Sequence, residues 1–88
     1  MKYKTEKLRK FFLKKDIVQI CQGLVIPEKV SNQEDREIYQ YVQSKIATGM
    51  GFDLTKKEDF LEFKNNISSC IESKEAIMHF VYKAIYDK

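Results

Sequence analysis

Proline, glycine and long apolar runs are all scarce in this chain, and each scarcity excludes a class of protein. The 88 residues include one Pro and three Gly, too few for a flexible linker or for the many turns of a small β sandwich. No apolar run approaches the roughly 20 residues of a membrane span or the apolar centre of a signal peptide. A cytoplasmic protein without a transmembrane segment is therefore expected.

Residues that commonly carry catalysis or bind metals are also few. The single histidine, His79, has no serine or cysteine at a spacing that would form a nucleophile pair. Cys21 and Cys70 fit no C-x-x-C or zinc spacing, and they are predicted to be buried free thiols, with a disulfide between them as the alternative. The sequence therefore predicts no enzyme, no metal site and no cofactor.

Two further patterns are compatible with chemistry, but ordinary helix structure explains both. Acidic residues cluster between Asp53 and Glu62, yet Glu58 and Glu62 fall on the polar side of an expected helix and have no His partners. The segment Gly49-Met50-Gly51 lacks the Lys and Ser/Thr that a phosphate-binding loop needs. The glycines are therefore expected to end a helix and turn the chain.

What the sequence does have is apolar residues recurring at intervals of three and four, with almost no strict alternation. This spacing predicts an all-α fold, a small single-domain bundle of four to five helices occupying residues 1–88. The expected helices cover residues 2–14, 17–23, 32–48, 56–72 and 74–86. A length of 88 residues gives a modest core and little room for a deep catalytic cleft.

Residues at the expected helix ends support these boundaries. The expected N-caps are Asp16, Ser31, Thr55 and Ser73. After Ser31 and Thr55, a Glu three residues later completes the spacing of a capping box. The expected C-terminal glycines are Gly23 and Gly49. Because Ile17 falls opposite the apolar side of the first helix, a break near Lys15 is favoured over one continuous helix.

The last expected helix is apolar around about 240° of its circumference, more than a one-sided surface helix needs. Either this helix is central and packed on both sides, or it leaves a strip free for a partner. Tyr and Met are residue types that interfaces favour. The candidate partner-binding residues are Met78, Tyr82 and Tyr86, with Tyr39 nearby.

Positive charge is concentrated at the N-terminus. Residues 1–15 hold seven Lys or Arg against one Glu, whereas residues 16–88 hold nine against twelve acids. The candidate anion-binding residues are Lys2, Lys4, Lys7, Arg9, Lys10, Lys14 and Lys15. Such a helix can bind nucleic acid, anionic lipid or an acidic protein. Alternatively, Leu8, Phe11 and Phe12 join the core while the lysines remain solvated.

These observations favour a non-catalytic protein–protein interaction module that presents a helix face to a partner protein or to a second copy. The Lys- and Ile-rich composition resembles that of small bacterial or phage-type inhibitor, immunity and regulatory proteins. The alternative is a nucleic-acid-binding regulator that uses the basic N-terminal helix. The preponderance of Lys over Arg in that helix counts against the alternative, because Arg binds bases and phosphates in bidentate fashion.

Overall fold

Five α-helices and one 3-10 turn make up the computed structural model, which describes residues 3–70 and 72–86. The elements are α1 (Thr5–Leu13), α2 (Ile17–Val25), η1 (Pro27–Lys29), α3 (Gln33–Met50), α4 (Lys57–Ser68) and α5 (Lys74–Tyr86). No β-strand occurs in these ranges, which confirms the prediction of an all-α fold. Nor is any helix in them both long and apolar enough to span a membrane.

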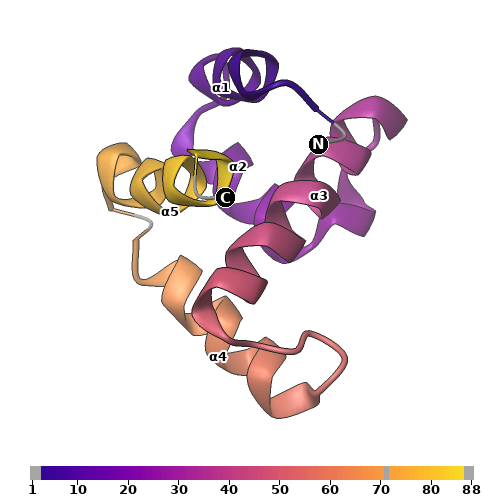
Figure 1. Ribbon diagram of the computed structural model, residues 1–88, viewed down its shortest axis with the longest axis vertical. Helices are drawn as coiled ribbons and strands as arrows, with labels where there is room; N and C mark the ends of the chain where they lie inside the picture. The colour runs from indigo at the N-terminus through magenta and orange to yellow at the C-terminus, as the bar shows by residue number, and fades with distance from the viewer. Residues whose placement is uncertain (1–2, 71, 87–88) are drawn as a thin grey trace.

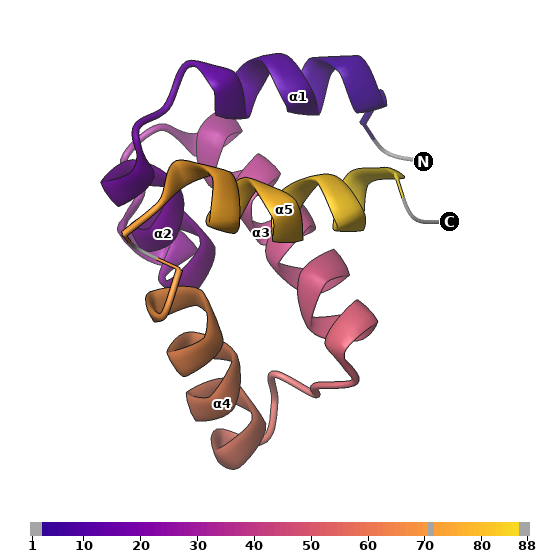
Figure 2. The ribbon, with the colours of Figure 1, turned by 90° about the vertical axis from the view of Figure 1, so that its left-hand side faces the viewer.

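The longest helix, α3, runs through the middle of the molecule (Figure 1). In the second view, α1 and α5 run side by side, α3 passes behind α5, and α4 lies below (Figure 2). The α3–α5 contact is the most extensive in the bundle. α5 also packs against α1 and α2, so it is largely a central helix.

Every helix contributes completely buried apolar side chains to one core. Its largest members are Leu8 and Phe12 of α1, Ile20 and Leu24 of α2, Ile38 and Val42 of α3, Phe63 and Ile67 of α4, and Ile77 and Val81 of α5. Both cysteines are free thiols, Cys21 buried and Cys70 half-buried. Burial, with a smaller contribution from Cys70, raises the pKa of the Cys21 thiol, as expected of an interior side chain rather than a nucleophile.

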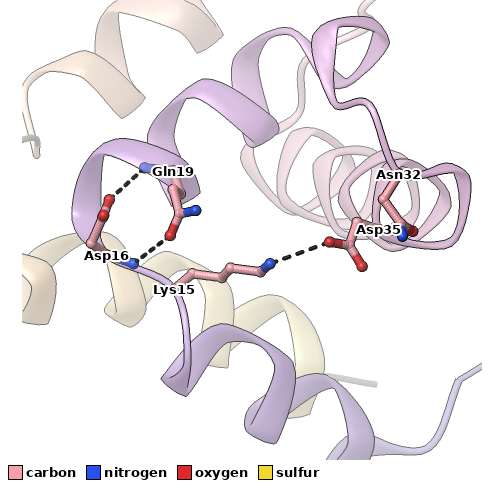
Figure 3. Close-up of polar contacts among 5 residues, drawn as sticks. All are labelled: Lys15, Asp16, Gln19, Asn32 and Asp35. Atoms are coloured by element: carbon pink, nitrogen blue, oxygen red, sulfur yellow. Dashed lines mark hydrogen bonds and ion pairs between the residues drawn. The ribbon is translucent and has the colours of Figure 1, made fainter.

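The predicted break near Lys15 is present, and Asp16 is the N-cap of α2 as expected. The Gln19 amide donates to the Asp16 carboxylate at 2.9 Å, and the Asp16 amide donates to the Gln19 side-chain oxygen at 3.1 Å. This reciprocal pair is a capping box. Beside it, Lys15 Nζ donates to the Asp35 carboxylate of α3 at 3.2 Å (Figure 3). The break is therefore held both locally and by a contact across the bundle.

Two of the expected N-caps are wrong, although the helices they were meant to start exist. The N-cap of α3 is Asn32, whose side chain accepts from the Asp35 amide at 3.0 Å, rather than Ser31. α4 begins after Lys56 without a side-chain cap, because the Thr55 hydroxyl donates to Asp53 at 2.6 Å instead. Ser31 and Thr55 each lie one residue too early for the backbone they were expected to cap. Ser73 does cap α5, and it accepts from the Ala76 amide at 3.3 Å.

The expected C-terminal glycines are also displaced. α3 continues past Gly49 to Met50, and its C-cap is Gly51, whose φ of 80° lies in the left-handed region that glycine favours. α2 continues through Gly23 to Val25. Gly23 has a packing role, since a Cβ there would overlap the ring of Tyr39. The short α2 thus approaches α3 more closely than any larger residue would allow.

We expect Gly23→Ala to destabilise the protein by about 1–3 kcal/mol, the usual cost of overpacking a core. Gly49→Ala is the matched control, because Gly49 is also helical but has nothing within 4 Å of an added Cβ. There the better helix propensity of Ala is expected to stabilise by up to about 1 kcal/mol. Urea unfolding followed by circular dichroism measures both. Equal effects of the two substitutions would contradict a close Gly23–Tyr39 contact.

Asp16→Ala is expected to lower the free energy of unfolding by about 0.5–2 kcal/mol, because it leaves an amide at the start of α2 without its partner. Asp16→Asn keeps an acceptor oxygen and is expected to retain most of this stability. Thermal and urea unfolding of the two variants test the expectation. If Asn were as damaging as Ala, the contribution of Asp16 would lie in its charge and not in the cap.

Candidate binding groove

A groove of about 530 Å³ lies between the C-terminal half of α3 and the middle of α5. Its apolar lining comes from Tyr41, Ile46, Met50, Phe80 and Ala84. A volume of this size is ordinary for a ligand site. The groove lies where two helices far apart in sequence pack together, so the fold itself creates it.

The α3 side of the groove lies beside the core-facing stripe of that helix. Val42 and Ile46 are buried in the core, whereas Tyr41 and Lys45, one turn apart, lie on the flank. Lys45 Nζ stands 5.6 Å from the centroid of the Tyr41 ring, a cation–π distance. α3 therefore presents an aromatic surface with a positive charge above it.

The α5 side is built in the same way. Val81 is completely buried, while the half-buried Phe80 and Ala84 lie on the flank that faces the groove. His79 and Lys83 are exposed at the outer edge, and the His79 ring lies 6.1 Å from that of Phe80. Each helix thus offers apolar side chains inside and a cation at the rim.

The positive charges of the groove belong to Lys45 and Lys83. Beside them, the described part of the lining holds His79 and the Tyr41 phenol and no Asp or Glu. Within residues 3–70 and 72–86, the ion pairs at 4.0 Å or less join Lys7, Lys10 and Lys15 to acids and include neither Lys45 nor Lys83. Among the described residues, the groove therefore has a positive rim that no acid pairs with.

The described side chains of the groove offer apolar walls and positive charge. The described lining contains the hydroxyls of Ser44 and Thr48 and the His79 imidazole, but no cysteine or carboxylate. Among the described residues, no group of three His, Cys, Asp or Glu could hold a metal ion. The apolar walls suit apolar side chains, and the lysines suit carboxylates.

The four candidate partner-binding residues do not form one surface. Met78 and Tyr39 are buried, with 5% and 3% of their surface exposed. Tyr82 is half-buried, and Tyr86 is 55% exposed with its ring centroid 6.0 Å from that of Tyr82. The accessible part of the predicted strip is thus one tyrosine pair near the end of α5. Met78 belongs to the core because α5 packs against α1, α2 and α3. Tyr39, on α3, is covered by Phe11 and Phe12 and by the backbone at Gly23.

The candidate anion-binding residues lie closer together, but acids accompany them. Lys4, Lys7, Lys10, Lys14 and Lys15 line a depression of about 590 Å³ that also includes Glu6 and Asp35. Lys7 pairs with Glu34 at 3.6 Å, Lys10 with Glu6 at 3.6 Å and Lys15 with Asp35 at 3.2 Å. Arg9 is half-buried outside this lining, and Lys2 falls outside the described residues. Half of the described cations of this segment are therefore paired within the protein.

The chain matches no known protein-family model, and no curated protein or solved structure resembles it significantly. The groove residues Tyr41, Lys45, Phe80 and Lys83 were not predicted as a site from the sequence. Each occupies an ordinary flank position of its own helix. Only the packing of α3 on α5 brings them together.

The burial of Tyr39 has a measurable consequence. Burial, with smaller contributions from Asp35 and Asp16, raises the pKa of this phenol to about 12, above the ordinary value near 10. Its contribution to stability is therefore complete below about pH 10 and is lost as the pH rises toward about 12. An ultraviolet absorbance titration is expected to show a late tyrosine step near pH 12.

Tyr39→Phe is expected to remove that late step, and titration in urea is expected to move it toward the ordinary value. If the wild-type and Tyr39→Phe absorbance titrations have the same shape above pH 11 and differ only in amplitude, Tyr39 has no late titration step. Tyr39 would then be accessible to solvent. It would then be available as a surface residue, as the sequence pattern alone suggested.

Proposed function

We propose that this protein is a non-catalytic protein-binding module and that the groove between α3 and α5 receives its partner. The observation that carries the proposal is the groove itself: apolar walls from two helices, open to solvent, with cations at the rim. An amphipathic helix laid in an apolar groove is a common mode of peptide recognition. The finer description, an inhibitor, immunity or regulatory protein, belongs to the same class and depends on what the partner does.

The shape of the molecule supports this function over catalysis. The inward sides of all five helices form the core. The accessible surface therefore consists of the outer flanks of the helices and the rim of the groove. The exposed ring of Tyr86, beside Tyr82, extends the accessible surface of α5 along its other flank. A partner bound in the groove contacts α5 at the Phe80 side, so the tyrosine pair is a separate surface.

The alternative, a nucleic-acid-binding regulator, has less support. Phosphate binding by α1 would require Lys7, Lys10 and Lys15 to exchange their present carboxylate partners for phosphates. Among the described residues, only Lys4 and Lys14 of the depression have no carboxylate partner, whereas tight nucleic-acid binding uses several phosphate contacts. The groove has no such internal competition.

Site-specific photocross-linking tests the proposed function. With benzoylphenylalanine in place of Ser44, an exposed groove residue, we expect a discrete protein adduct in cells that naturally make the protein. The same substitution at Lys64, exposed on α4 and outside the groove, is the control and is expected to give none. Denaturing electrophoresis with mass spectrometry identifies the adduct. Absence of an adduct at Ser44, or equal labelling from both positions, would contradict the proposal.

A further inference from the structure

Given the proposed function, which this step assumes, we infer that the groove binds an acidic amphipathic helix of another protein. Such a helix would place apolar side chains between α3 and α5 and carboxylates against Lys45 and Lys83. The inference rests on three features of the groove: its length, its charge, and the inability of a second copy to fill it.

The length of the groove fits a short helix. Along α3 its lining runs from Tyr41 to Met50, which at 1.5 Å per residue is about 14 Å, or two and a half turns. A partner helix of about ten residues spans that distance. Its apolar residues at i, i+3 or i+4, and i+7 would lie against Tyr41, Phe80 and Met50 in succession.

The charge of the groove selects the sign of the partner. In the N-terminal segment, Lys7, Lys10 and Lys15 are paired with acids at 3.2–3.6 Å. Lys45 and Lys83 stand at the groove rim with no carboxylate within 4.0 Å and no acid in the lining among the described residues. Carboxylates of a partner would supply the missing charge, and complementary potentials also speed the encounter.

The same argument locates the acids on the partner. α3 ends at Met50, and the C-terminal end of a helix carries partial negative charge that repels anions. Carboxylates are therefore favoured beside Lys45 and Lys83 and disfavoured beside Met50. We expect the partner to place an apolar residue at the Met50 end of the groove.

A second copy of this chain does not meet these requirements. The most suitable acidic helix in it is α4, where Glu58 and Glu62 flank Leu61, which is 47% exposed. Of the other large apolar residues of that helix, Phe60 is half-buried, and Phe63 and Ile67 are completely buried in the core. α4 can thus offer one exposed and one half-buried apolar side chain to a groove that needs about three. A different protein is the better occupant.

Three synthetic peptides of about fourteen residues provide the probe. All carry Leu on one face at i, i+3 or i+4, and i+7 spacing, and the flanking positions are Glu in the first, Gln in the second and Lys in the third. Fluorescence anisotropy of the labelled peptides gives their affinities. We expect the Glu peptide to bind wild-type protein about three- to tenfold more tightly than the Gln peptide, as expected for two exposed ion pairs. The Lys peptide is expected to bind most weakly, and high salt should reduce these differences.

A matched pair of double variants assigns the effect to the groove. Lys45→Glu with Lys83→Glu is expected to reverse the preference in favour of the Lys peptide. Lys29→Glu with Lys64→Glu makes the same change in net charge at exposed positions outside the groove and is expected to keep the preference. Circular dichroism verifies that both are folded, and amide chemical shifts are expected to move in α3 and α5.

Several results would overturn the inference. Equal binding of the Glu and Gln peptides in the groove would show that the partner need not be acidic, but it would leave the proposed function intact. The proposed function is contradicted by a different result, the absence of a cross-linked adduct at Ser44. Loss of the preference in both double variants would show a net-charge effect. No binding of any peptide, or light scattering showing a dimer that excludes the peptides, would also contradict it.

Discussion

The close approach of Gly23 to Tyr39 is the constraint around which the bundle is arranged. With no Cβ at Gly23, α2 lies directly on the Tyr39 ring of α3. The rings of Phe11 and Phe12 meet the same ring edge-on, with centroid distances of 5.4 and 5.7 Å. One aromatic side chain thus joins α1, α2 and α3. Edge-to-face pairs contribute roughly 0.5–1.5 kcal/mol each beyond the burial of their surface, a substantial amount for a domain of this size.

This arrangement also explains the basic N-terminal helix. α1 has two completely buried residues, Leu8 and Phe12, so apolar packing holds it along one narrow stripe. Lys7 of α1 and Lys15, which follows it, then pair with Glu34 and Asp35 at the start of α3. The same two acids favour the positive end of that helix. Exposed ion pairs are each worth little, and the Lys15–Asp35 pair is the least exposed of the three. The charge of α1 therefore serves in part to orient it on the bundle.

Helix positions could be predicted from the sequence because the spacing of buried residues is a local property. Ile77, Val81 and Ile85 recur at one helical turn whatever packs against them. Helix ends were less predictable, since Ser31 and Asn32 are both good caps and the start of the backbone turn decides between them. The exposure of individual side chains was harder still to predict. When a helix is apolar on most sides, as α5 is, its sequence does not reveal which sides the neighbouring helices cover. Met78 lies inside and Tyr86 outside for that reason.

The groove is the clearest case of a feature that only tertiary packing creates. Tyr41 and Lys45 lie on α3, and Phe80 and Lys83 lie on α5, with the whole of α4 between them in the sequence. Neither pair is unusual on its own helix. α5 packs against α1, α2 and α3, and this packing leaves a groove along the C-terminal half of α3. The flank left open is apolar, since it borders the core, and basic, since the acids of α3 lie at its other end. The acids of α3 lie at its N-terminal end, where they pair with lysines of the N-terminal segment, and not at its C-terminal end, where the groove is. The uneven placement of acids along this one helix thus accounts both for the ion pairs at one end and for the positive groove at the other.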